Sequence, residues 1–242
     1  MSDLPPLVLL TDFGHRDAYV GVMKGVVATV APTLRVIDLC HEIPPQAVEQ
    51  AADLLAQSWA WFPENSVFVA VVDPGVGTDR RAIVARIAGR LFVGPDNGLC
   101  SRIAPETTEV RELPHAWGLA LRSSTFHGRD LFAPAGARLA NRSVRFEDAK
   151  PLADFVRLPA APEGTVRAVD HFGNAITNLP AQNRGFVRWR AQCIPVVRTY
   201  ADGVPGTLVA LTGSNGALEL AVPGGSAAAY GVAIGDAVEW KP

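Results

Sequence analysis

The sequence is poor in cysteine, in charge and in long hydrophobic runs, and each shortage excludes a class of protein. Its 242 residues include only three cysteines, Cys40, Cys100 and Cys193, with no CxxC pair, so neither a disulfide framework nor a zinc knuckle is expected. The clean apolar runs, such as residues 67–72, have strand length and fall far short of a membrane span. We therefore expect no membrane partner, and a reducing, cytoplasmic environment for the thiols.

An excess of charge of one sign is also missing. Lys and Arg number 22 against 24 Asp and Glu, which gives a formal net charge of -2. Because there is no basic excess, a nucleic-acid partner is not expected. The N-terminus has no basic region, so no signal peptide is expected either. Hydrophobic residues make up 48% of the chain, which is enough at this length to bury a sizeable core.

The first 155 residues alternate between strand-like and helix-like patterns. Continuous apolar runs, of the kind found in strands covered on both faces, are separated by apolar stripes at helical spacing. The pattern predicts an α/β domain at residues 1–157 with a central, mostly parallel sheet. Strands are expected at residues 7–10, 34–39, 66–72, 82–87 and 90–93, and helices at 20–30, 48–59 and 131–139.

The rest of the chain has a different character. Residues 158–164, Leu-Pro-Ala-Ala-Pro-Glu-Gly, have the composition of a linker. Beyond them come short apolar runs separated by Gly, Pro and Asp, without a long helical stripe. This pattern predicts a smaller all-β domain at residues 165–242, a barrel or a sandwich. Its strands are expected at residues 166–169, 186–189, 194–197, 208–211, 218–222 and 237–240.

Three carboxylates follow predicted strands, where ligands collect in open α/β sheets. They are Asp12, Asp73 and Asp96. Each has a structural alternative, because Asp12 could cap the next helix and the other two stand in good turn sequences. The glycines of residues 75–77 lack the ending of a phosphate-binding loop and the third glycine of a dinucleotide fingerprint.

His127 precedes the predicted helix at residues 131–139, and a lone histidine is often only structural. Together with Asp12 and Asp73 it could suggest a metal site. The histidines are scattered and form no HxH or HxxxH pair, so no metal cofactor is expected.

Two segments of the β domain combine groups that suit a purine. Residues 170–178 offer an aromatic ring for stacking and amides for hydrogen bonds, and residues 213–216 precede a strand. Taken singly, both can also be β-turns.

Six motifs, taken in order, resemble one family. The chain is similar to the S-adenosyl-L-methionine hydroxide adenosyltransferases, which are relatives of the fluorinases and chlorinases. The resemblance implies an α/β domain followed by a β-barrel domain, and a homotrimer with active sites at subunit interfaces. The motifs are TDFG (11–14), VVDPGVGTDRR (71–81), GPDNG (94–98), TFHGRD (125–130), DHFGNAITN (170–178) and GSNGALELAV (213–222).

The resemblance also implies an activity and a set of site residues. It implies an (S)-S-adenosyl-L-methionine hydrolase that forms adenosine and L-methionine without a metal. The catalytic trio would be Asp73, Arg80 and His127. The implied substrate-binding residues are Asp12 for the ribose, Asn174 and Val222 for adenine, Asp170 and Ser214 for methionine, Phe126, Phe172 and Tyr200 as packing walls, and Glu219 on the same strand as Val222.

The proposed chemistry suits these residue types. A sulfonium leaves as a neutral thioether, so the reaction needs a positioned, activated water rather than a general acid. Halogenation is disfavoured, because the Asp73 carboxylate would repel a halide by about 1–4 kcal/mol at contact distance. Whether Asp73 or His127 takes the proton stays open at this level. Two other functions also stay open, a binding module for adenosine or S-adenosyl-L-methionine without turnover and a metal-dependent nucleotide hydrolase.

Overall fold

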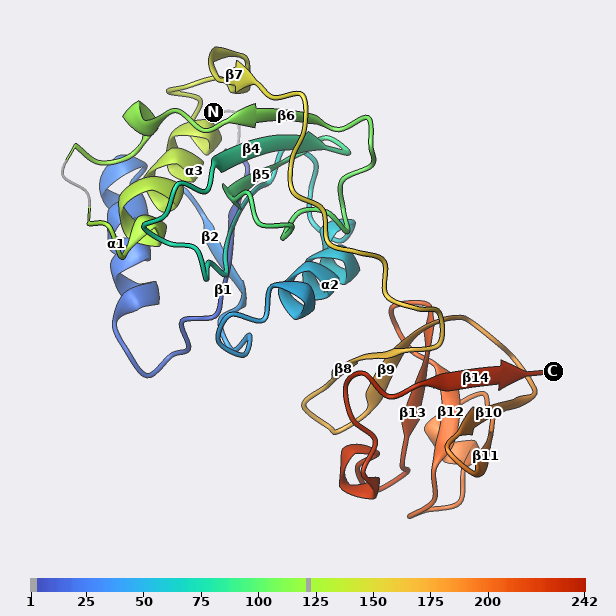
Figure 1. The fold of residues 1–242 in the computed structure, drawn as a ribbon. Coiled ribbons are helices and arrows are strands. Elements are labelled where there is room, and N and C mark those ends of the chain that lie inside the picture. The colour runs from blue at the N-terminus through green and yellow to red at the C-terminus, as the bar shows by residue number, and fades with distance from the viewer. Residues whose placement is uncertain (1–3, 121–122) are drawn as a thin grey trace. The chain divides into compact units, whose positions relative to one another are not determined.

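The computed structural model describes residues 4–120 and 123–242 and divides the chain into two compact units (Figure 1). The first unit is Met1–Leu158 and the second is Pro159–Pro242. Each unit has its own apolar core, so each is described by itself. None of the helices in the described ranges has the length and hydrophobicity that crossing a bilayer requires.

The first unit is built on a seven-stranded sheet with the order β2-β1-β3-β5-β4-β6-β7. Strands β2, β1, β3 and β5 run parallel, whereas β4, β6 and β7 join through antiparallel pairs. The prediction of a mostly parallel sheet is therefore corrected to a mixed sheet, because the tight β4–β5 connection at residues 88–89 forces an antiparallel pair. The strands are β1 (Leu7–Thr11), β2 (Val36–Cys40), β3 (Val67–Val71), β4 (Ala82–Ile87), β5 (Arg90–Pro95), β6 (Glu109–Glu112) and β7 (Lys150–Pro151).

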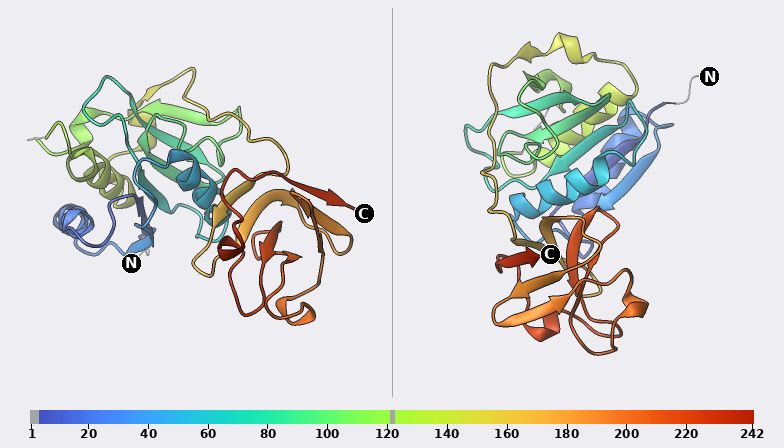
Figure 2. Two further views of the ribbon diagram at one scale, coloured as in Figure 1. Left: turned by 60° about the horizontal axis from the view of Figure 1, so that its bottom comes forward. Right: turned by 90° about the vertical axis from the view of Figure 1, so that its right-hand side faces the viewer.

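Helices cover both faces of this sheet, which explains why the central strands are apolar throughout. In β1, Leu7 and Leu9 point to one core, whereas Val8 and Leu10 point to the other. Helices α1 (Tyr19–Val30) and α3 (Ala133–Ala140) lie side by side over the first face, and α2 (Val48–Trp59) covers the second (Figures 1 and 2).

The approach of α3 to the sheet depends on one glycine. A Cβ at Gly136 would lie 2.3 Å from Val69 Cγ2, so only glycine allows this helix to pack directly on β3. The predicted helix at residues 131–139 is confirmed for most of its length. Its first turn is a π-helical segment, Gly128–Phe132, that begins directly after His127.

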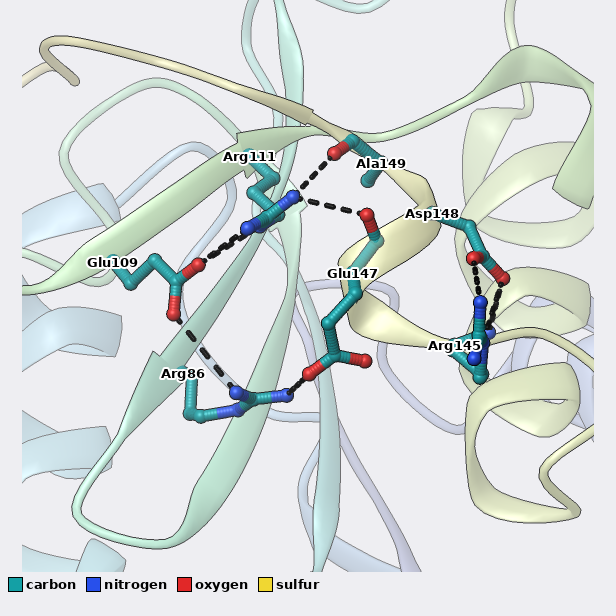
Figure 3. Close-up of polar contacts among 7 residues, drawn as sticks. All are labelled: Arg86, Glu109, Arg111, Arg145, Glu147, Asp148 and Ala149. Carbon is teal, nitrogen blue, oxygen red and sulfur yellow. Dashed lines mark hydrogen bonds and ion pairs between the residues drawn. The ribbon is translucent and has the colours of Figure 1, made fainter.

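Strand β6 does not have an apolar pattern and was not predicted. Charged side chains stabilise this part of the sheet (Figure 3). The Arg111 guanidinium donates to the carbonyl oxygens of Glu147 and Ala149 at 3.1 and 2.8 Å, and Arg86 pairs with the Glu147 carboxylate. Both guanidinium groups also lie over the ring of Phe146, at 4.2 Å for Arg86 and 5.0 Å for Arg111. A strand next to the sheet edge can thus be ordered by ion pairs that a search for hydrophobic alternation misses.

The second unit consists of two antiparallel sheets, in the orders β11-β10-β14 and β12-β13-β9-β8. Within residues 159–242 no closed barrel is formed. The edges of the two sheets meet only at two isolated bridges, Thr165 with Ala237 and Val196 with Ala210. The predicted barrel is therefore corrected to two sheets. The strands are β8 (Val166–Val169), β9 (Ala175–Pro180), β10 (Phe186–Trp189), β11 (Gln192–Pro195), β12 (Val209–Thr212), β13 (Ala217–Ala221) and β14 (Val238–Lys241).

Candidate active site

A cavity of about 360 Å³ lies in the first unit, beside the ends of β1 and β3. Its volume falls in the usual range of about 300–1,000 Å³ for small-molecule sites. The predicted residues Asp12, Asp73, Phe126 and His127 all line it. The remaining lining residues are Phe13, Tyr19, Pro45, Gln46, Val71, Pro74, Val76, Thr125 and Gly128.

Asp96, the third carboxylate that follows a strand, is not among the residues lining this cavity. Its side chain is buried and accepts hydrogen bonds from Arg81 Nε at 2.7 Å and from the Val156 amide at 2.8 Å. Arg81 also binds Asp154 at 2.8 Å. Asp96 therefore fastens the segment around residue 156 to the end of β5. Asp96 follows its strand at the predicted sheet edge, but it does not line the cavity that Asp12 and Asp73 line.

Asp73 and Arg80 form an ion pair with several contacts. Arg80 Nε donates to both carboxylate oxygens of Asp73, at 2.9 and 3.0 Å, and Nη2 donates to Oδ2. The Asp73 side chain is 5% exposed and that of Arg80 is 12% exposed. A turn brings the two together. At its centre Gly77 has φ +79°, and a Cβ there would lie 2.6 Å from the Ser124 carbonyl oxygen.

His127 contacts the same arginine, and this contact assigns the position of its proton. Arg80 Nη2 lies 2.8 Å from His127 Nδ1. A guanidinium can only donate, so Nδ1 accepts, and the N–H of the neutral ring is at Nε2. Burial lowers the pKa of His127 below its ordinary value of 6.5, and the neighbouring Arg80 charge lowers it further. His127 is therefore a neutral hydrogen-bond donor at neutral pH.

Arg80 is separated from the first cavity by its two partners. It lines a second cavity of about 260 Å³, and His127 lines both. Among the described residues, the lining of the first cavity includes Asp73 but not Arg80. Arg80 thus orients the Asp73 carboxylate and the His127 imidazole from the side that faces away from the first cavity.

Asp12 is anchored by the backbone rather than used as a helix cap. Its Oδ2 accepts the Gln46 amide at 2.8 Å, while α1 begins after Ala18 without a side-chain cap. The buried His41 holds the turn that carries Asp12 at both ends. Its Nδ1 lies 2.8 Å from Thr11 Oγ1, and its carbonyl oxygen accepts the Gly14 amide at 2.7 Å. Asp12 is therefore presented to the cavity on a fixed turn.

In the second unit, Asp170 shapes a turn between β8 and β9. Its Oδ1 accepts the amides of Phe172 and Asn174 at 2.9 and 2.8 Å, and its Oδ2 accepts Asn174 Nδ2 at 3.0 Å. This network buries Asn174 and leaves the Phe172 ring 73% exposed. The turn alternative for residues 170–173 is therefore confirmed, and it presents an aromatic ring to its surroundings.

The other predicted residues of the second unit lie in and around β13. Tyr200 donates its hydroxyl hydrogen to Glu219 Oε1. Burial raises the pKa of the Glu219 carboxyl above its ordinary value, and burial raises the pKa of Tyr200 to about 12. Ser214 is exposed in the turn before β13, whereas the Val222 side chain packs inside the core of the unit.

Nine lining residues of the first cavity lie outside the predicted set, and three of them bear on how the site works, namely Phe13, Tyr19 and Gln46. Phe13 belongs to the TDFG motif and could have been found there. Tyr19 begins α1 on its exposed side, where sequence alone gives no reason to select it. Gln46 acts through its backbone, which no residue type reveals.

No metal-binding cluster stands out in the described ranges. Groups of three or more His, Cys, Asp or Glu side chains that could hold an ion are absent from residues 4–120 and 123–242. The expectation that the protein needs no metal cofactor stays a prediction.

Sequence comparisons match both units to one family. The model of the SAM hydroxide adenosyltransferase N-terminal domain matches residues 7–150, and that of the C-terminal domain matches residues 164–239. An (R)-S-adenosyl-L-methionine hydrolase from Thermus thermophilus is 45% identical, over 92% of this chain and 93% of the relative. A fluorinase from Nocardia brasiliensis is 27% identical, over 98% of this chain and 97% of the relative.

The fold has a close match among solved structures. A crystal structure of an uncharacterized conserved protein from Thermotoga maritima superposes with a TM-score of 0.90 at 34% identity. The match covers 97% of this chain and 100% of the other.

The comparisons correct one prediction, the configuration at sulfur. Relatives at 45%, 41% and 42% identity are all named (R)-S-adenosyl-L-methionine hydrolase. The prediction of an (S)-S-adenosyl-L-methionine hydrolase is therefore wrong. The two configurations carry the same substituents at sulfur in a different arrangement, and none of the sequence observations tells the two arrangements apart.

Proposed function

The chain belongs to the SAM hydroxide adenosyltransferase family, and from this premise we propose that it hydrolyses (R)-S-adenosyl-L-methionine to adenosine and L-methionine. The observation that carries the proposal is the contact set of Asp73, Arg80 and His127 at the wall of a cavity of about 360 Å³. A binding protein without turnover would not need a buried ion pair joined to an imidazole there.

In the proposed reaction the oxygen of a water molecule bonds to the ribose C5′ while the C5′–S bond breaks. The electron pair of that bond goes to sulfur, and the sulfonium leaves as the neutral thioether of methionine. The water oxygen becomes the 5′-hydroxyl of adenosine, and one proton is released. Holding the water in line with the breaking bond can lower the barrier by up to about 7–11 kcal/mol.

The hydrogen bonds of the site support a different role for each residue in this proposal. His127 accepts from Arg80 at Nδ1, so it offers the water an N–H from Nε2 and has no free lone pair for its proton. Asp73, which faces the cavity, is the acceptor that remains, and it passes the proton on to solvent. Arg80 fixes the orientation of both groups.

The other predicted residues enter the proposal as substrate contacts. Asp12 binds the ribose, Phe126 packs against the substrate, and the second unit contributes contacts to adenine and methionine. We propose the residues Asp170, Phe172, Asn174, Tyr200, Ser214, Glu219 and Val222 for these contacts. We further propose a cytoplasmic homotrimer with its active sites at subunit interfaces, without a metal and without a nucleic-acid or membrane partner; sedimentation analysis tests the trimer.

A single assay tests the proposed reaction. The purified protein is incubated with (R)-S-adenosyl-L-methionine and EDTA, and adenosine and methionine are quantified by chromatography. We expect equal amounts of both products. Asp73→Asn should reduce the rate by at least about 100-fold, as expected on losing a general base. Asp79→Asn, which alters an exposed carboxylate of the same loop, is the matched control and should keep the rate. Binding without turnover by the unaltered protein would refute the hydrolase proposal.

A further inference from the structure

The charges around the first cavity suit a cation. Among the described lining residues, the ionised side chains are the carboxylates of Asp12 and Asp73, and no lysine or arginine is present. His127 is neutral at neutral pH because its pKa is lowered by burial and by Arg80. The Arg80 charge is directed at Asp73 and lines the other cavity. A positively charged ligand therefore meets no like charge among these lining residues.

Three aromatic rings stand together on the same cavity. The ring centroids of Phe13, Tyr19 and Phe126 form a triangle with sides of 5.8, 5.8 and 5.2 Å, and all three residues line the cavity. The rings meet at steep angles of 56–88°, so they do not stack on one another. Aromatic faces attract cations within about 6 Å of the ring centroid.

Tyr19 is the most exposed residue of this triangle. The Phe126 ring already has the Arg129 guanidinium over it, at 5.0 Å. Phe13 is packed against the start of the π-helical segment, where a Cβ on Gly128 would lie 3.2 Å from its ring. Tyr19 is 49% exposed although it is a large aromatic residue. Packing within the unit does not explain why this large aromatic ring is exposed on a cavity wall.

We propose that Tyr19 is a specificity-determining residue whose ring, supported by Phe13 and Phe126, recognises the positive charge of the substrate sulfonium. The inference rests on the proposed function and deepens it. The site then distinguishes a sulfonium from a neutral thioether of nearly the same shape. Thioethers bind weakly as a result, and the methionine product leaves readily.

The probe for charge is S-adenosyl-L-homocysteine, which lacks both the S-methyl group and the charge. We compare its inhibition constant with the KM for (R)-S-adenosyl-L-methionine, measured in the same initial-rate assays. A cation–π contact of the expected strength corresponds to a ratio of Ki to KM of about five to thirty in the unaltered protein. Tyr19→Phe keeps the ring and should preserve the ratio. Tyr19→Leu removes the ring and should bring the ratio close to one by raising KM, with little change in Ki.

The control and the possible outcomes separate this inference from the proposed function. Val22→Ala alters another exposed apolar residue of α1 that is not a lining residue and should change neither constant. An equal loss of affinity for both ligands in Tyr19→Leu would overturn the inference, because the ring would then act by packing alone. A ratio near one in the unaltered protein would overturn it without any variant. If the unaltered protein does not hydrolyse the sulfonium at all, the proposed function fails and this inference fails with it.

Discussion

The ion pair between Asp73 and Arg80 allows a quantitative test of the site, through a double-mutant cycle. Asp73→Asn keeps the shape of the side chain but removes its charge and half of its acceptor capacity. Arg80→Met keeps an apolar stem beside Phe132, whose ring centroid is 5.3 Å from the guanidinium, and removes all of its donors. The double variant removes both charges and leaves neither partner alone.

The magnitude follows from burial and geometry. Both side chains are nearly buried, at 5% and 12% exposure, and Nε and Nη2 of Arg80 both donate to Asp73. Removing one partner of such a pair leaves an uncompensated charge and costs about 3–5 kcal/mol. We expect each single variant to lose about 3 kcal/mol of unfolding free energy and the double variant to lose clearly less than the sum. The coupling energy should be about 2–3 kcal/mol.

The assay is urea unfolding followed by the helical circular dichroism signal. In the described part of the chain, all three α-helices belong to the first unit, so this signal reports on the unit that holds the pair. Adenosine release is measured on the same samples and should be reduced in all three variants. If the two single effects add within about 0.5 kcal/mol, the residues are energetically independent. The assignment of Arg80 as the group that orients Asp73 would then be refuted.

Two further predictions concern ionisation. The pKa of His127 is lowered, so the ring stays neutral to a pH below 6.5. Protonation at Nδ1 would end its acceptance from Arg80 and place a positive charge at the cavity, so kcat/KM should fall about tenfold per pH unit once the pH drops below that lowered pKa. A pH–rate profile without an acid limb would contradict the need for a neutral His127. The stability due to the neutral ring is fully present above pH 6.5 and is lost as the pH falls through the lowered pKa. Because burial raises the pKa of Glu219, the folded unit holds this proton above pH 4.5, and stability falls as the pH rises through the raised pKa. Glu219→Gln keeps an acceptor for Tyr200, so calorimetry should show a larger gain in stability at pH 8 than at pH 5, and an equal gain at both would contradict the burial argument.

Hydrophobic patterning predicted the strands that lie between the two helical layers and the edge strand β2, and it failed at the opposite margin, at β6 and β7. The side chains of residues 67–71 point alternately into two different cores, and both cores are apolar. Every position of this strand is therefore apolar, which is the pattern that the sequence analysis detects. In β6, Val110 is buried and the other three residues are charged, so charged contacts rather than an apolar run order the strand. Residues 175–178 of β9 are also the second half of the motif at residues 170–178. That motif was interpreted as groups that suit a purine, or as a β-turn, so no strand was predicted there.

Four residues that the motifs supplied line one cavity, but the motifs did not reveal the geometry around them. The cavity brings Asp12, Asp73, Phe126 and His127 together, although these residues are separated by up to 115 positions. Sequence did not show that Asp96 is used to fasten the chain, or that Arg80 stands behind Asp73. Both outcomes depend on which of several arginines and backbone amides lies next to each carboxylate. Tertiary packing decides this, and the sequence does not show it. Tyr19 was not found because its neighbours in space come from other segments of the chain.

The position of Arg80 resolves a conflict built into this chemistry. The site must hold a cationic substrate, yet it also needs a permanent positive charge to orient the Asp73 carboxylate. The repulsion between two cations falls with their distance, and a carboxylate between them offsets it. The Arg80 guanidinium, on the far side of Asp73 from the cavity, therefore repels a bound sulfonium far less than a guanidinium on the cavity surface would. The cost is that Asp73 and Arg80 must both be buried, which only a close, multiply bonded pair can tolerate. The turn at residues 73–80, with its glycine at position 77, supplies that pair from one short segment of chain.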